Sequence, residues 1–216
     1  MSLENKYNKI VSKHNRNAII RVIPGHFATT HSHINYYIDM AILKSRKSEA
    51  QAAAEVLSYK YSHSTVVDTI ICMDGCEVIG AYLAEELTNA GIMSMNQHQT
   101  MYVVSPEVNT DGQIIFRDNM QMMIRGRHVI LLLASATTGR TVERALQCVD
   151  YYGGQVVGIS AIFSAVDKIR NIDVNSIFTT DELQGYETYD SFNCPMCASG
   201  QKLDAIVNSY GYSELI

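Results

Sequence analysis

Apolar residues recur along the chain in two different spacings. Some short runs are almost continuously apolar, as in strands that are covered on both faces of a parallel sheet: 65–73, 101–104, 129–133 and 156–163. Other stretches repeat apolar residues every three or four positions, as helices do: 39–59, 78–91 and 142–149. Because strands and helices alternate, the pattern predicts an α/β fold with a mostly parallel sheet and helices on both of its faces.

The remaining segments follow other patterns. Residues 1–23 predict a helix and then a short extended stretch, which Pro24-Gly25 interrupts before a polar loop that carries histidines and reaches Tyr36. Residues 105–127 are polar around Asn109-Thr-Asp-Gly112 and predict an arm or hairpin outside the central sheet. Residues 197–215 predict a helix that packs on the sheet or on a partner subunit.

Length and composition narrow the possible classes of protein. A chain of 216 residues fits a single domain, and none of its apolar runs approaches the ~20 residues that span a bilayer. The net charge of −5, without a long basic run, argues against a nucleic-acid partner. Five cysteines without a disulfide pattern, and a start without an apolar signal region, favour a reducing cytoplasm.

The segment with the clearest chemistry is the apolar strand from Val129 that runs through small and hydroxyl residues directly into a helix. Ligands of parallel sheets bind beyond the carboxyl ends of the strands. There, small residues and a helix N-terminus offer free N–H groups and partial positive charge to an anion. The predicted phosphate-binding residues are Ala136, Thr137, Thr138, Gly139, Arg140 and Thr141. A plain turn, capped by a threonine and relaxed by Gly139, explains the same residues without a ligand.

The whole segment resembles the phosphoribosyl-pyrophosphate motif of type I phosphoribosyltransferases. That motif is an apolar strand, two acidic residues, two apolar residues and then Thr-Thr-Gly-x-Thr/Ser. The resemblance implies that the loop from Thr137 to Thr141 binds the 5′-phosphate of the sugar. The two acidic positions, which hold the ribose hydroxyls in the family, are occupied here by Leu133 and Ala134.

Further resemblance, in particular to orotate phosphoribosyltransferases, covers most of the chain. Gly25-His-Phe27 and the stretch from Ile34 to Asp39 resemble the N-terminal part of that family, which implies base contacts from His26, Phe27, Thr30 and Tyr37. The family's base-contacting lysine falls on Thr30. The pyrophosphate loop falls on Asp74, Gly75, Cys76 and Glu77, which an ordinary Asp-Gly turn explains equally well.

The resemblance implies one type I phosphoribosyltransferase domain over residues 1–216. It comprises an N-terminal hood and base-contact region (1–40), a core sheet (60–180), a C-terminal extension (181–216) and a flexible arm (105–127). The arm lacks the family's basic motif and retains Arg117, Arg125 and Arg127. The implied assembly is a cytoplasmic homodimer without a membrane or nucleic-acid partner.

The implied reaction is transfer of phosphoribose from phosphoribosyl pyrophosphate (PRPP) to a nucleobase, as in pyrimidine biosynthesis, with release of pyrophosphate. The family uses Mg²⁺, and whether this chain binds it stays open without the two acidic residues. The alternative is a lapsed enzyme that binds or senses a phosphorylated sugar or nucleotide.

Two other groups of residues are assigned no metal. Cys194-Pro-Met-Cys197 has the spacing of a thiolate pair that could bind zinc, but a tetrahedral site needs two more ligands and an isolated pair is more often incidental, so a structural turn is expected. The histidines His26, His31 and His33 are interpreted as contacts to the base or to a neighbouring subunit.

Overall fold

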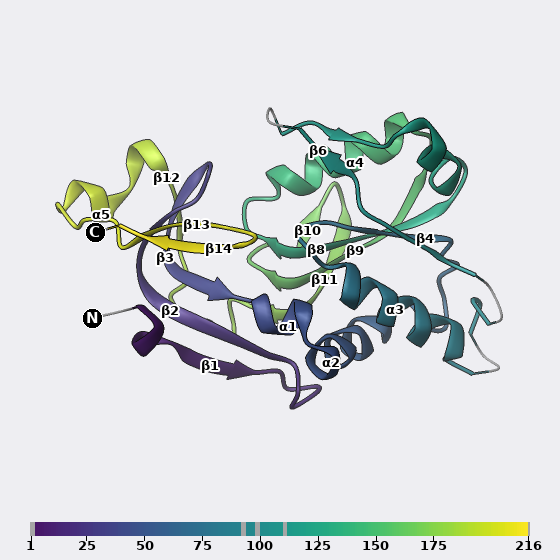
Figure 1. Ribbon diagram of the computed structural model, residues 1–216, viewed down its shortest axis with the longest axis horizontal. Coiled ribbons are helices and arrows are strands. Elements are labelled where there is room, and N and C mark those ends of the chain that lie inside the picture. Colours follow the sequence, from purple (N-terminus) through teal and green to yellow (C-terminus); the bar gives the residue numbers. More distant parts are fainter. Residues whose placement is uncertain (1–2, 92–93, 98–99, 110–111, 216) are drawn as a thin grey trace.

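The computed structural model describes residues 3–91, 94–97, 100–109 and 112–215, and its strands form two large sheets and one small hairpin (Figure 1). The core sheet has the strand order β10-β11-β9-β8-β4-β5 and is parallel apart from β10. Its strands are β4 (Thr69–Cys72), β5 (Tyr102–Val104), β8 (His128–Ala136), β9 (Gln155–Ser164), β10 (Lys168–Ile169) and β11 (Ile172–Thr179). The predicted α/β fold class is confirmed.

Helices cover both faces of the core sheet, as the apolar runs predict. Alternate residues of β8 point to opposite sides, so Leu132 packs with α2 (Lys47–Ser58) and α3 (Glu77–Asn89), whereas Leu133 packs with α4 (Arg140–Tyr151). The short helix α1 (Ala41–Ser45) precedes α2 in place of one continuous helix. No helix in the described part of the chain is long and apolar enough to cross a membrane.

The second sheet, here called the hood sheet, has the strand order β12-β3-β2-β13-β14, with β1 paired to β2. Its strands are β1 (Asn8–Val11), β2 (Ile19–Ala28), β3 (Ser32–Asp39), β12 (Thr188–Asp190), β13 (Ala205–Asn208) and β14 (Gly211–Glu214). It lies to one side of the core sheet and joins the two ends of the chain in one layer (Figure 1).

The helix and the histidine-bearing loop predicted in the first 36 residues were wrong, whereas the short extended stretch predicted before Pro24 is the start of β2. Apart from the short 3₁₀ helix η1 (Leu3–Lys6), this part of the chain forms strands, and β2 continues through Pro24. The register between β2 and β3 shifts between Pro24 and Phe27, which lets the strand accommodate a residue that lacks an N–H donor. The histidine-bearing segment is therefore mostly part of a β-hairpin.

The predicted C-terminal helix was also wrong. After η3 (Ser191–Asn193) and the short helix α5 (Pro195–Ala198), the chain forms the β13–β14 hairpin. Ala205 and Val207 are buried while Ile206 and Asn208 are exposed, which is the two-residue period of a strand. This hairpin extends the hood sheet through the parallel pairing of β13 with β2.

The arm lies outside the core sheet, as predicted. It contains the hairpin of β6 (Glu107–Val108) and β7 (Ile114–Ile115) and the 3₁₀ helix η2 (Asp118–Met123). Phe116 is buried against Tyr152, and the Cys148 thiol of α4 donates to the carbonyl of Ile114. These contacts pack the arm against α4 of its own chain.

Candidate functional site

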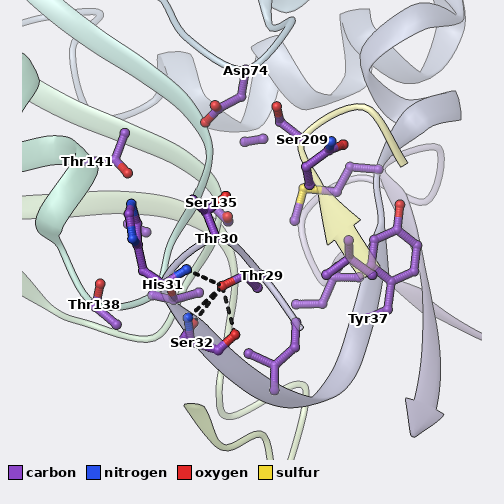
Figure 2. A pocket seen from close by; sticks show the side chains of 18 of the residues that line it. Thr29, Thr30, His31, Ser32, Tyr37, Asp74, Ser135, Thr138, Thr141 and Ser209 are labelled. Atoms are coloured by element: carbon purple, nitrogen blue, oxygen red, sulfur yellow. Dashed lines mark hydrogen bonds between the residues drawn. The ribbon is translucent and has the colours of Figure 1, made fainter. Parts of the chain in front are cut away.

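A pocket of about 320 Å³ lies where the carboxyl ends of β4 and β8 meet the hood sheet (Figure 2). Its volume is in the range of small-molecule sites. The core sheet contributes Asp74 and residues 134–142. The hood sheet contributes the β2–β3 turn (residues 29–32), Tyr37 and the β13–β14 turn around Ser209. The carboxyl-end position is the one expected for a ligand site in a parallel sheet.

All six predicted phosphate-binding residues line this pocket: Ala136, Thr137, Thr138, Gly139, Arg140 and Thr141. Gly139 has a φ of 74° and is the N-cap of α4, a backbone conformation that residues with a Cβ rarely adopt. Among the described residues, no side chain or carbonyl accepts a hydrogen bond from the N–H groups of 137–139. The turn is open to the pocket and carries the free donors and helix dipole that an anion needs.

The predicted pyrophosphate loop contributes only its first residue to the pocket. Asp74 lines the pocket, whereas Cys76 is buried and Glu77 accepts a hydrogen bond from Ser105. Asp74 and Gly75 both have positive φ, so the backbone turns sharply between β4 and α3. Burial raises the pKa of the Asp74 carboxyl, an effect that the Ala134 amide and the Lys44 ammonium partly offset.

Lys44 is a buried cation in the pocket wall that sequence reasoning missed. Its Nζ donates to the carbonyl oxygens of Asp74 at 2.7 Å and Ser209 at 2.8 Å. It therefore connects the β4–α3 turn of the core sheet to the β13–β14 turn of the hood sheet. No local signal distinguishes it from the exposed lysine three residues later, because both carbonyls belong to distant parts of the chain.

The β2–β3 turn carries the predicted base contacts at its tip. The Thr29 hydroxyl accepts from the backbone N–H groups of His31 and Ser32 and donates to the Ser32 carbonyl, which fixes the turn beside the pocket (Figure 2). Thr30 lines the pocket with His31.

Of the other three predicted base contacts, one lines the pocket and two do not. Tyr37 lines the pocket, and burial with the nearby Asp39 raises its pKa to about 12, so it stays a hydrogen-bond donor. His26 and Phe27 are fully buried and lie outside the pocket lining.

Leu133 and Ala134, which occupy the two acidic positions of the family motif, have different surroundings in the structure. Leu133 is fully buried on the α4 side of β8, so a carboxylate there would be placed in the apolar core. Ala134 lines the pocket, and its amide neighbours the Asp74 carboxylate. Asp74 is the one carboxylate among the lining residues that the structure describes.

The cations of the arm lie outside this pocket. Arg117 forms a bidentate ion pair with Glu107, and Arg127 lies 4.0 Å from Asp68. Arg125 lines a separate hollow beside Tyr151 and Tyr152. The positive charges in the pocket wall come instead from Lys44 and Arg140.

Asp74 gives a prediction in which stability and ligand binding change in opposite directions. Asp74→Asn removes a charge whose ionised form burial disfavours, and asparagine tolerates positive φ. We expect the variant to be more stable at pH 7 by about 0.5–2 kcal/mol, the usual gain from one stabilising substitution, and to bind PRPP with Mg²⁺ more weakly, because it lacks the one lining carboxylate, among the described residues, that could hold the ion. Denaturant unfolding measures the first effect and calorimetry the second.

The sign of the pH dependence follows from the raised pKa. The penalty on wild type is present when Asp74 is ionised, so the advantage of the variant should shrink as the pH falls and be absent well below 3.8, the ordinary value. The exposed Asp167→Asn is the matched control and should change neither quantity. A variant less stable than wild type at pH 7 would show that the carboxylate stabilises the fold.

Comparison with known proteins agrees with the resemblance seen in the motifs. No family model matches the chain. Orotate phosphoribosyltransferase of Desulforamulus reducens is 24% identical over 83% of this chain and 86% of the relative. Orotate phosphoribosyltransferase of Sulfurimonas denitrificans is also 24% identical, over 84% of this chain and 90% of the relative.

Solved structures establish the fold independently of close sequence similarity. Leishmania donovani UMP synthase aligns with a TM-score of 0.53 at 18% identity, covering 75% of this chain and 34% of that chain. Adenine phosphoribosyltransferase of Thermoanaerobacter pseudethanolicus aligns with a TM-score of 0.51 at 15% identity, covering 82% and 97%. Orotate phosphoribosyltransferase of Mycobacterium tuberculosis, in complex with Fe(III) dicitrate, aligns with a TM-score of 0.51 at 14% identity, covering 76% and 91%. The chain therefore has the type I phosphoribosyltransferase fold, and its sequence resembles that of orotate phosphoribosyltransferases over most of its length.

Proposed function

We propose that the protein binds PRPP in this pocket and transfers the phosphoribosyl group to a nucleobase, with release of pyrophosphate. The observation that carries the proposal is the turn around Gly139, whose free amides open into the pocket at the N-terminus of α4. A dianionic 5′-phosphate suits this turn, because the helix dipole and several N–H donors act on it together.

The other walls of the pocket suit the remaining parts of the substrate. The Lys44 ammonium has three N–H donors and uses two on carbonyls, so one donor and the charge remain for a pyrophosphate oxygen. The β2–β3 turn offers the Thr30 hydroxyl and the His31 ring to the edge of a base. With the 5′-phosphate at the turn around Gly139 and the pyrophosphate at Lys44, the sugar would lie between these two groups.

The proposed reaction balances as a substitution at C1′ of the sugar. A ring nitrogen of the base forms the new bond to C1′ while the bond from C1′ to the pyrophosphate oxygen breaks, and the electron pair leaves with pyrophosphate. The transition state carries positive charge on the sugar and growing negative charge on the leaving group. Lys44 would stabilise that negative charge in a partly buried site, where electrostatic interactions are strong.

Mg²⁺ fits the pocket only together with the substrate. The ion usually binds one or two carboxylates and takes its other ligands from substrate phosphates and water. Asp74 is the carboxylate on the wall of the pocket that could hold it. Bound there, Mg²⁺ would supply positive charge that neutralises the pyrophosphate.

Pyrophosphate release tests the proposal directly. The purified protein is incubated with PRPP, Mg²⁺ and, one at a time, orotate, uracil, adenine, hypoxanthine and guanine. We expect release that depends on one base and is lost in a variant with valine at Thr138 and Thr141. Silence with every base, from protein that binds PRPP, would contradict the transferase and leave the alternative below.

The resemblance also supports a homodimer that acts in the cytoplasm in nucleotide metabolism. A dimer would let one subunit's arm approach the partner's pocket, which the described residues of the arm do not line in their own chain. Light scattering tests this proposal, and the mass of a single chain at micromolar concentration would contradict it.

A non-catalytic sensor of a sugar phosphate or nucleotide is the second candidate. Its supporting observation is that neither Leu133 nor Ala134 brings a carboxylate to the pocket. This protein would bind ribose 5-phosphate, a nucleoside monophosphate or PRPP without turnover. Calorimetry that detects no affinity for any of the three would contradict both candidates.

Restoring one acidic residue distinguishes a lapsed enzyme from a protein that never needed it. Ala134→Asp places a carboxylate in the pocket wall, whereas an acid at the fully buried Leu133 would disrupt the core. If the missing acid limits the reaction, we expect pyrophosphate release to rise by about 10-fold to 100-fold, the value of one hydrogen bond to a charged group. Unchanged release from a folded variant would show that Ala134 does not limit turnover.

A further inference from the structure

Four side chains with metal-binding atoms converge beside the β2–β3 hairpin, outside the pocket. His26 lies on β2 and His33 on β3, while Cys194 directly precedes the short helix α5 and Cys197 lies within it. One nitrogen or sulfur atom from each residue lies within 4.8 Å of the corresponding atoms of the other three. We propose that these residues form a structural Zn²⁺ site of the Cys₂His₂ type.

The distances match a tetrahedral ion. With Zn–N near 2.0–2.1 Å and Zn–S near 2.3 Å, tetrahedral geometry separates two nitrogens by about 3.3 Å and a nitrogen from a sulfur by about 3.5 Å. His26 Nε2 lies 3.1 Å from His33 Nδ1, 3.5 Å from Cys194 Sγ and 3.7 Å from Cys197 Sγ. His33 Nδ1 lies 3.3 Å from Cys197 Sγ. The ligand atoms of these side chains are therefore already spaced as they would be around one shared cation.

The tautomer of His26 makes its cluster-facing nitrogen a ligand atom. His26 is fully buried, and its Nδ1 lies 2.9 Å from the carbonyl oxygen of Gln201. A carbonyl only accepts, so Nδ1 carries the proton and Nε2 carries the lone pair of the neutral ring. Zinc-bound histidines commonly have such a partner on the other nitrogen.

Hydrogen bonding alone does not account for this convergence. The single lone pair of His26 Nε2 is approached by one imidazole nitrogen and two sulfur atoms, and it can accept only one short hydrogen bond well. A cation at the centre would instead accept electron pairs from all four groups. Two thiolates and two neutral imidazoles balance the charge of Zn²⁺, which suits a site in which His26 and Cys194 are buried.

The zinc site would hold together the segments that form one wall of the proposed substrate pocket. His26 and His33 flank the turn of residues 29–32 that lines the pocket, and the cysteines come from the chain that leads to β13 and Ser209. Four protein ligands complete the tetrahedron, so the ion would have a structural rather than a catalytic role. The ion would bind beside the hood sheet whether or not the pocket catalyses a reaction.

Metal content gives the first test. Untagged protein, purified under reducing conditions without chelator from zinc-supplemented medium, should contain about one zinc per chain by mass spectrometry. His33→Gln and Cys197→Ser should each lose most of it. His31→Ala, on the same hairpin, and Cys148→Ser, on α4, are the matched controls and should retain it.

Wild-type protein gives a second test that does not depend on whether the variants fold. X-ray absorption at the zinc edge should show two sulfur and two nitrogen neighbours, and the cobalt-substituted protein should show the thiolate-to-metal bands of a tetrahedral site. Chelation should lower the melting temperature of the wild type. Wild type without stoichiometric zinc after supplementation, or a zinc shell without sulfur, would overturn the inference.

Discussion

Replacing Thr138 and Thr141 with valine is expected to lower the affinity for ribose 5-phosphate by about 10²-fold to 10⁴-fold. Both threonines line the pocket at the start of α4, and both are exposed there. A hydrogen bond to a charged group contributes about 1.5–3 kcal/mol, or roughly 10-fold to 100-fold for each hydroxyl. Valine keeps the shape of threonine, so the loss would report on the hydroxyl donors. Calorimetry measures the affinity.

The control for this experiment is an exposed threonine elsewhere. Thr180 lies after β11 and outside the pocket, so the Thr180→Val variant should bind ribose 5-phosphate as wild type does. All three proteins should have the same melting temperature within a few degrees. Equal affinity of wild type and the double variant would show that the phosphate is not held by these hydroxyls.

Replacing Lys44 with methionine has the other large expected effect, because it acts on stability and on binding. The two carbonyl oxygens that accept from Lys44 would lose their partner, and each such loss costs about 1–3 kcal/mol. We therefore expect the free energy of unfolding to fall by at least about 2 kcal/mol. PRPP affinity should fall more than ribose 5-phosphate affinity, since the pyrophosphate end is the part assigned to this cation.

Lys47→Met is the matched control. Lys47 is exposed at the first position of α2, three residues after Lys44, and is absent from the pocket lining. Urea unfolding and calorimetry of both variants separate the two effects. A Lys44→Met protein that keeps its preference for PRPP over ribose 5-phosphate would exclude Lys44 from the pyrophosphate site.

The sequence predicted the elements whose identity depends on nearby residues. The strands of the core sheet are apolar on both faces, so β8 and β9 appear as continuous runs whatever their partners. The predicted phosphate-binding segment is also local, because a strand, a glycine with positive φ and a helix N-terminus follow one another within a few residues. Both the fold class and this segment could therefore be predicted.

The hood sheet could not be predicted, because its strands are defined by distant partners. The parallel pair of Ala205 with Phe27 and the antiparallel pair of Thr188 with Ile34 join opposite ends of the chain. Residues 1–23 alone carry a mixed pattern that fits a helix as well as a strand.

The roles of Lys44 and of the cysteine and histidine cluster could not be predicted either, because their partners are far away in the sequence. His26 and His33 are too far apart for the usual zinc-binding spacing, and only the antiparallel pairing of β2 with β3 brings them together. A histidine on each strand of a hairpin, with a Cys-x-x-Cys elsewhere, is the signal that could have indicated the site.

We propose that the backbone amides around Gly139 bind a phosphate group at the N-terminus of α4. The most direct measurement is a ¹H–¹⁵N NMR titration of the protein with ribose 5-phosphate. We predict saturable changes that are largest, and downfield in ¹H, at the amides of residues 137–141. Absence of shifts at these amides at millimolar ligand, or shifts confined to another surface, would contradict phosphate binding at this turn.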